Sequence, residues 1–109
     1  MSEMTLREVC QCIGVSRRAV QGYEEAKLVS ATGRTERGYL LYNESATERI
    51  KDIKLYQDMG FTIKEIIAII DAPSEVKKAA LLLRKEELNN KILHERTMIE
   101  IIQEMLLQL

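Results

Sequence analysis

The sequence predicts a mainly α-helical protein with one small β-hairpin and a long C-terminal coiled-coil helix. Three observations support this fold class. One proline and five glycines in 109 residues leave most of the chain able to form helices. Capping-box patterns, which mark helix starts, recur in the first two thirds of the chain. In the last third, apolar residues repeat in alternating steps of four and three, the pattern of a coiled coil.

The first two predicted helices form a helix-turn-helix. The stretch from Thr5 to Glu8 is a capping box, in which a threonine and a glutamate satisfy the backbone N–H groups at a helix start. Gly14 supplies the permissive backbone of a tight turn. Ser16 is placed to cap a second helix that runs through Glu25. Two short helices joined by a glycine turn are a helix-turn-helix candidate.

A hairpin is expected next. Residues 30–37 are mostly polar, and residues 38–42 form a short run with β preference. We interpret this segment as a wing beside the helix-turn-helix. Its tyrosines, Tyr39 and Tyr42, alternate poorly for one exposed face, so we expect at least one to pack inward with its hydroxyl near the surface.

Two further helices complete the first domain, which we place at residues 1–72. The third starts at Asn43 or Ser45, with residues 45–48 as its capping box, and Gly60 ends it. Residues 62–65 are another capping box and open the fourth helix. The predicted buried face of that helix consists of Ile63, Ile66, Ile67 and Ile70.

The remaining residues, 73–109, are predicted to form a dimerisation coiled-coil helix. Pro73 stops the fourth helix, and Ser74 can cap a last helix of roughly 52 Å, too long to pack within so small a domain. Charged Lys85 and Glu95 interrupt its apolar seam. The dimerisation residues are Leu81, Leu88, Ile92, Ile99, Ile102, Leu106 and Leu109. Such a seam predicts a partner helix.

Composition and charge bear on two classes of protein, nucleic-acid binders and enzymes. The formal net charge is −1, so the overall positive charge expected of a nucleic-acid binder is missing. The first 42 residues carry six basic and five acidic side chains, a net charge of +1. Any affinity for DNA must therefore come from locally clustered arginines. The sequence contains no set of residues in a recognisable catalytic pattern, so we expect a protein that is not an enzyme and needs no cofactor.

The sequence also argues against a membrane protein and a metal site. It has no apolar run of the roughly 20 residues that span a bilayer and no signal-peptide pattern, so the cytoplasm is expected. Cys10 and Cys12 lie two residues apart on a helix, where their thiols point about 200° apart and cannot share one ion. We expect buried or half-buried thiols. The single histidine, His94, is assigned no role.

The N-terminal two thirds of the chain resembles the mercury-resistance regulator (MerR) family. The resemblance is carried by residues 5–9, by Gly14 to Glu25, by Lys27 to Val29, by Arg34 to Tyr42, by Arg49 and Ile50, and by Met59 to Ile66. It extends from Met4 to about Asp71. It implies a DNA-binding transcription regulator whose second helix enters the major groove, with flanking loops on the phosphates.

The same resemblance assigns the DNA-binding residues. Arg18 is the position expected in the groove, Arg17 the one that reaches a phosphate, and Tyr23 is available for a backbone or packing contact. The full set is Arg17, Arg18, Gln21, Tyr23, Arg34, Arg37 and Tyr39. We expect a homodimer with antiparallel long helices on an inverted repeat of double-stranded DNA, acting by DNA distortion, with RNA polymerase at the promoter as a further partner. No effector domain is expected after Leu109, and no inducer is identified.

Three departures from the family pattern keep other functions open. Gln21, Gly22 and Leu40 stand where the family commonly has arginines and an aromatic residue or histidine, which removes two phosphate contacts and a stacking surface. One alternative is an excisionase-like architectural DNA binder, which usually lacks a long dimerisation helix. The other is a protein-interaction adaptor that has lost DNA binding, as the near-neutral charge would permit.

Overall fold

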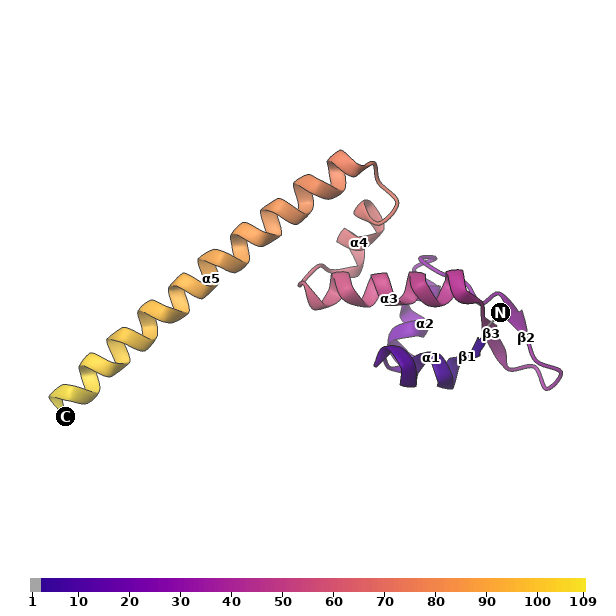
Figure 1. Ribbon diagram of the computed structural model, residues 1–109, viewed down its shortest axis with the longest axis horizontal. Helices are drawn as coiled ribbons and strands as arrows, with labels where there is room; N and C mark the ends of the chain where they lie inside the picture. Colours follow the sequence, from indigo (N-terminus) through magenta and orange to yellow (C-terminus); the bar gives the residue numbers. More distant parts are fainter. Residues whose placement is uncertain (1–2) are drawn as a thin grey trace. The chain divides into compact units, whose positions relative to one another are not determined.

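The computed structural model describes residues 3–109 and confirms the mainly α-helical fold class with its hairpin and long last helix (Figure 1). The chain divides into two compact units, one ending at Asp71 and the other spanning Ala72–Leu109. The elements are β1 (Met4–Thr5), α1 (Leu6–Ile13), α2 (Arg17–Glu25), β2 (Gly33–Arg34), β3 (Leu40–Tyr42), α3 (Glu44–Asp58), α4 (Ile63–Ile69) and α5 (Ser74–Gln108).

The helix-turn-helix forms as its caps predict. The hydroxyl of Thr5 accepts from the backbone N–H of Glu8, and the carboxylate of Glu8 accepts from that of Thr5, which completes the capping box of α1. Gly14 then adopts a left-handed backbone with φ of 78°, a conformation that glycine reaches without steric cost. Ser16 caps α2 by accepting from the N–H of Ala19 at 3.0 Å. Local side-chain chemistry thus sets the start of both helices and the turn between them.

The hairpin belongs to a three-stranded antiparallel sheet of order β1-β3-β2. The predicted wing supplies β2 and β3. The third strand, β1, was not predicted; it pairs Met4 with Tyr42 and Thr5 with Leu41, which attaches the base of the wing to the start of α1. Two residues are too few to show an alternating pattern, so the sequence carries no signal for this strand.

Two predictions about α3 and α4 are wrong in detail. Asn43 caps α3 by accepting from the N–H of Ala46 at 2.9 Å, so Ser45 lies within the helix and the capping box at residues 45–48 does not form. In α4 the capping box of Thr62 is confirmed. Ile67 is 51% exposed, however, and Ile69 is buried instead. Positions 66, 69 and 70 share one side of a helix by the i, i+3, i+4 rule, which places position 67 outward.

A single apolar core holds the first unit together. Its fully buried side chains come from α1, α2, β3, α3 and α4, so every helix before Asp71 contributes to it. The buried members are Val9, Val15, Val20, Tyr23, Leu28, Val29, Tyr42, Ala46, Ile50, Ile53, Ile66 and Ile70. Burial of each large aliphatic side chain stabilises the fold by about 1.5–3 kcal/mol, so this set is the main source of stability in the unit.

The second unit is dominated by α5, a helix of 35 residues. The prediction that Ser74 caps it is wrong: Ser74 is its first helical residue, no side chain caps it, and the carbonyl of Pro73 accepts from the N–H groups of Val76 and Lys77. No residue of α5 is buried. None of the helices in the described residues is long and apolar enough to cross a membrane.

We predict that Gly22→Ala stabilises the first unit by about 1 kcal/mol. Gly22 lies inside α2, and a Cβ built there meets nothing within 4 Å, so alanine gains its helix propensity without a clash. The measurement is urea unfolding followed by tyrosine fluorescence, because all four tyrosines precede Ala72.

The matched control is Gly14→Ala, where the space for a Cβ is also empty but φ is +78°. Alanine in that conformation should lower the free energy of unfolding by about 1–2 kcal/mol. Equal effects of the two substitutions would contradict this account of both glycines.

Candidate nucleic-acid interface

The exposed face of α2 carries its polar side chains. Val20 and Tyr23 are buried, whereas Arg17, Arg18 and Gln21 are exposed. Position 21 lies one turn beyond both position 17 and position 18, so Gln21 neighbours both arginines and the three side chains form one surface near the N-terminal end of the helix. This is the arrangement in which a helix can present hydrogen-bond donors to another molecule while its other side holds it to the core.

The tip of the wing is held by a set of short hydrogen bonds. The N–H of Thr35 donates to the carbonyl of Tyr39 at 2.8 Å, and the N–H of Tyr39 donates to the Thr35 hydroxyl at 3.1 Å. Gly38 turns the chain with φ of 86°. Arg34 donates from Nη1 to the carbonyl of Gly38 at 2.8 Å, so its side chain braces the turn, and Arg37 is exposed.

The tyrosines named by the sequence are placed very differently. Tyr39 is 63% exposed on the wing, whereas Tyr23 is only 1% exposed and donates its hydroxyl to Gln57 at 2.6 Å. Burial, together with the charge of Asp58, raises the pKa of Tyr23. Of the two roles considered for Tyr23, a packing contact is therefore the one that the structure supports, because a buried ring offers no surface to DNA.

Tyr42 packs inward, as expected of at least one wing tyrosine. Its hydroxyl donates to the half-buried carboxylate of Glu24 at 3.2 Å. Burial, reinforced by the charge of Glu24 and this hydrogen bond, raises the pKa of Tyr42 to about 12. The same carboxylate accepts from the N–H of Ala31 at 3.2 Å. Glu24, which the sequence analysis missed, thus ties α2 to both ends of the hairpin.

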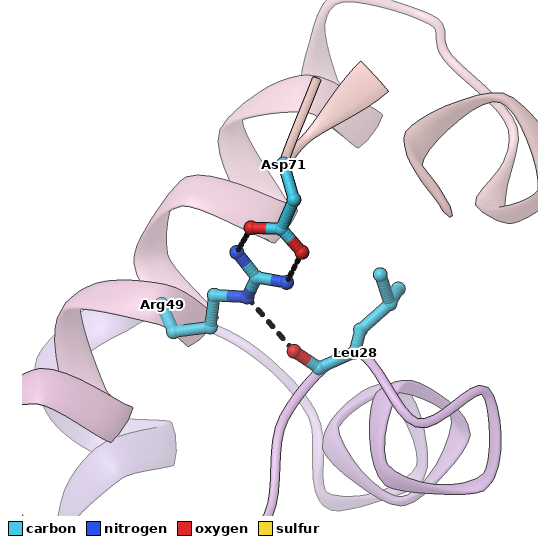
Figure 2. A network of polar contacts seen from close by, with 3 residues as sticks. All are labelled: Leu28, Arg49 and Asp71. Atoms are coloured by element: carbon cyan, nitrogen blue, oxygen red, sulfur yellow. Dashed lines mark hydrogen bonds and ion pairs between the residues drawn. The ribbon is translucent and has the colours of Figure 1, made fainter. Parts of the chain in front are cut away.

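Arg49 of α3 belongs to the family resemblance, but its contacts were not predicted from the sequence. Its Nη1 and Nη2 donate to the two carboxylate oxygens of Asp71 at 2.6 and 2.7 Å, and its Nε donates to the carbonyl of Leu28 at 2.8 Å (Figure 2). The hydrogen bond to Asp71 is the main cause of a raised pKa for Arg49. One guanidinium thereby joins the end of the helix-turn-helix, α3 and the last residue of the first unit.

The two cysteines do not form a site. Cys10 is half-buried, as expected, but Cys12 is exposed, which corrects the expectation that both thiols are sheltered. The correction follows from helix geometry, because a residue two positions along a helix faces the opposite way. Within residues 3–109 no group of three or more His, Cys, Asp or Glu side chains is placed to hold a metal ion.

The predicted seam of α5 is exposed along its whole length. Its seven members are between 37% and 100% exposed in the single chain. Apolar side chains outside the seam are exposed too, among them Leu83, Leu93 and Ile101. An exposed apolar surface of this kind is typical of a site of association.

The caps, wing and core define a winged helix-turn-helix domain followed by a long helix. Residues 4–72 match the family described as MerR HTH family regulatory protein, and they make up well over half of the chain. The chain belongs to this family. The match covers the whole of the first unit from β1 to the linker before α5.

Known relatives extend the similarity into α5. The HTH-type transcriptional activator mta of Bacillus subtilis is 33% identical over 102 residues, which are 94% of this chain and 40% of that protein. The crystal structure of MtaN, the N-terminus of the Bacillus subtilis multidrug transporter activator, is 32% identical and superposes with a TM-score of 0.73. That comparison covers 94% of this chain and 97% of the other.

A third comparison supports the fold alone. HiNmlR, a MerR family regulator lacking the sensor domain and bound to promoter DNA, is 16% identical, with a TM-score of 0.72 over 91% of this chain and 80% of that one. The family accounts for the absence of catalytic groups noted in the sequence, since its members named here are regulators and not enzymes.

We predict that Arg49→Ala lowers the free energy of unfolding of the first unit by about 1–2 kcal/mol, and Asp71→Asn by less than about 1 kcal/mol. The Asp71 side chain is 74% exposed and that of Arg49 only 27%, so solvent weakens the ion pair, while the hydrogen bond to Leu28 depends on Arg49 alone. Urea unfolding of each variant measures the difference.

Lys54→Ala serves as the control on the same helix. Lys54 pairs with Asp58 one turn away, a contact within α3 that should contribute only about 0.3–0.5 kcal/mol. A loss for Arg49→Ala no larger than that for Lys54→Ala would show that the three-way contact does not hold the segments together.

Proposed function

We propose that this protein is a sequence-specific DNA-binding transcription regulator of the cytoplasm, in which α2 reads the major groove. The observation that carries the proposal is the exposed face of Arg17, Arg18 and Gln21 at the start of a helix whose other side is buried. A helix fits the major groove, and side chains near its N-terminus reach base edges. The wing residues Arg34, Arg37 and Tyr39 supply contacts to the flanking phosphates, with Arg34 also bracing the wing.

We further propose that the regulator is a homodimer, with residues 1–72 as its DNA-binding domain and residues 73–109 as its dimerisation helix. Antiparallel pairing along the seam would cover the apolar surface that α5 exposes as a single chain. A two-fold dimer matches an inverted repeat, since each protomer reads one half-site.

Regulation by DNA distortion is the mechanism that this arrangement favours. Paired α5 helices would hold the two α2 helices of the dimer at a fixed separation. A promoter that binds both α2 helices would have to bend and untwist to match that separation, and RNA polymerase is the partner that the distorted promoter would affect. Distortion of a site of 20–30 base pairs costs on the order of 1–6 kcal/mol, which the phosphate contacts of a dimer can supply. The B. subtilis relative is named a transcriptional activator.

We predict that Arg18→Ala and Arg37→Ala weaken DNA binding in different ways. Arg18→Ala should lower affinity for the preferred site by about 1–3 kcal/mol and relax the sequence preference, because a base contact discriminates among sequences. Arg37→Ala should weaken all DNA similarly and reduce the slope of log K against log [salt] by about one unit per subunit, because a phosphate contact acts through counterion release.

The experiment starts with selection of bound sequences from a random duplex library by the unmodified protein. Affinities for the selected site and a scrambled duplex are then measured over a range of salt concentrations. If the protein selects nothing and shows no salt-dependent binding, the adaptor alternative replaces the regulator. Selection without dimerisation would favour the excisionase-like architectural binder.

We predict that the chain sediments as a dimer and that Ile99→Glu converts it to a monomer of 12.5 kDa. Ile99 is a seam residue, and a carboxylate there would be buried without a partner charge. Leu83→Glu is the matched control, since Leu83 is 61% exposed and lies on the side of the helix opposite the seam. A monomer for the unmodified chain, or equal effects of both substitutions, would overturn the dimer.

A further inference from the structure

A cleft that the sequence analysis did not anticipate lies between three segments of the first unit. It has a volume of about 580 Å³ and opens to the surface. Its walls come from the start of α1, the start of α2 and the tip of the wing. The lining residues are Thr5, Leu6, Arg7, Arg17, Gly38, Tyr39 and Leu40. Arg7 has no place in the DNA-binding set expected from the sequence.

The chemistry of the lining is that of an anion site. Its two ionisable charged groups are the guanidinium groups of Arg7 and Arg17, and none of the described residues that line it carries a carboxylate. A guanidinium offers paired N–H donors whose spacing matches two phosphate oxygens. Tyr39, which is exposed, adds a hydroxyl donor at the wing side. Two arginines from different helices can therefore grip one anionic group from two directions.

The walls of this cleft are held before any ligand binds. The wing tip is fixed by the hydrogen bonds between Thr35 and Tyr39 and by the bond from Arg34 to the Gly38 carbonyl. On the opposite wall, the capping box of Thr5 fixes the start of α1, and pairing of β1 with β3 holds that start against the wing. A preformed site loses little conformational entropy on binding, which favours a specific contact over a chance approach of two mobile side chains.

We infer that this cleft binds a backbone phosphate of duplex DNA next to the groove that α2 enters, with Arg7 as its additional phosphate-binding residue. The inference rests on the proposed function. Arg17 lines the cleft and precedes Arg18 on α2, so a phosphate held there would lie beside the bases that Arg18 reaches. An open cleft suits a phosphate that remains part of a strand. Because the contact is to the backbone, Arg7 supplies affinity and orientation but no sequence preference.

The test compares Arg7→Ala with the unmodified protein on the selected duplex and on a scrambled one, across a range of salt. Arg7→Ala should weaken binding to both duplexes by a similar factor, about tenfold, and reduce the salt slope by about one unit per subunit. Arg7→Lys keeps the charge and loses the paired donors, so it should retain the salt slope and recover part of the affinity.

Lys51→Ala is the matched control. Lys51 is an exposed cation of the same unit that does not line the cleft, and its removal should leave binding unchanged. Thermal melts establish that all variants remain folded; alanine at position 7 leaves the capping box intact, because that box uses Thr5 and Glu8.

The outcomes separate this inference from the proposed function. If the unmodified protein binds DNA and Arg7→Ala behaves like Lys51→Ala, the phosphate site is overturned while the regulator stands. If Arg7→Ala weakens binding to the selected duplex alone, Arg7 contacts a base and the phosphate assignment is wrong. If the unmodified protein binds neither duplex at any salt concentration, the proposed function fails and the site falls with it.

Discussion

The burial of one side of α2 is the constraint on which the rest of the first unit depends. A helix of nine residues is too short to be stable in water by itself, and α2 holds its conformation because Val20 and Tyr23 lie inside the core. With these two side chains inward, helix geometry leaves Arg17, Arg18 and Gln21 outward. The outward face of α2 is therefore set by what the helix must bury, and it persists only while the core around Val20 and Tyr23 stays closed.

Polar contacts then fix the segments that the apolar core leaves adjustable. Glu24 accepts from Tyr42 and from the backbone of Ala31, so the hairpin is held to α2 at its base. Arg49 joins Leu28 to Asp71, where the first unit ends. Among the described residues, every buried side-chain nitrogen or oxygen has a hydrogen-bond partner. These contacts contribute less free energy than apolar burial, but they fix the relative orientation of the segments more closely, because a hydrogen bond weakens steeply away from its preferred distance and angle.

The second unit differs from the first in that it has no core of its own. In α5 no side chain is buried, and the helix exposes leucine and isoleucine along its seam and beyond it. The winged domain matches the MerR HTH regulatory family. The similarity to MtaN extends over nearly the whole chain, so MtaN has the same combination of a winged domain and a long helix. The first unit closes its own core, whereas the second has no buried residue in the single chain.

Sequence alone determined the features that depend on neighbours in the chain. The capping boxes at Thr5 and Thr62 and the glycine turn at Gly14 each involve residues a few positions apart, so the local sequence is enough to predict them. The seam of α5 rests on the same kind of local pattern and stays a prediction. The inward packing of one wing tyrosine was also expected, although the sequence could not say that its hydroxyl would meet Glu24.

Only the tertiary structure decided the features that join distant segments. The pairs of β1 join residues 36 and 38 positions apart, Glu24 meets Tyr42 across 18 positions, and Arg49 meets Asp71 across 22. The cleft at Arg7 brings together residues up to 35 positions apart, and no local periodicity in the sequence predicts such contacts. Tertiary packing also chose between local options of similar energy: Asn43 and not Ser45 caps α3, Ile69 and not Ile67 enters the core, and Tyr23 is inside. Local rules propose such alternatives, and the burial of a shared core selects among them.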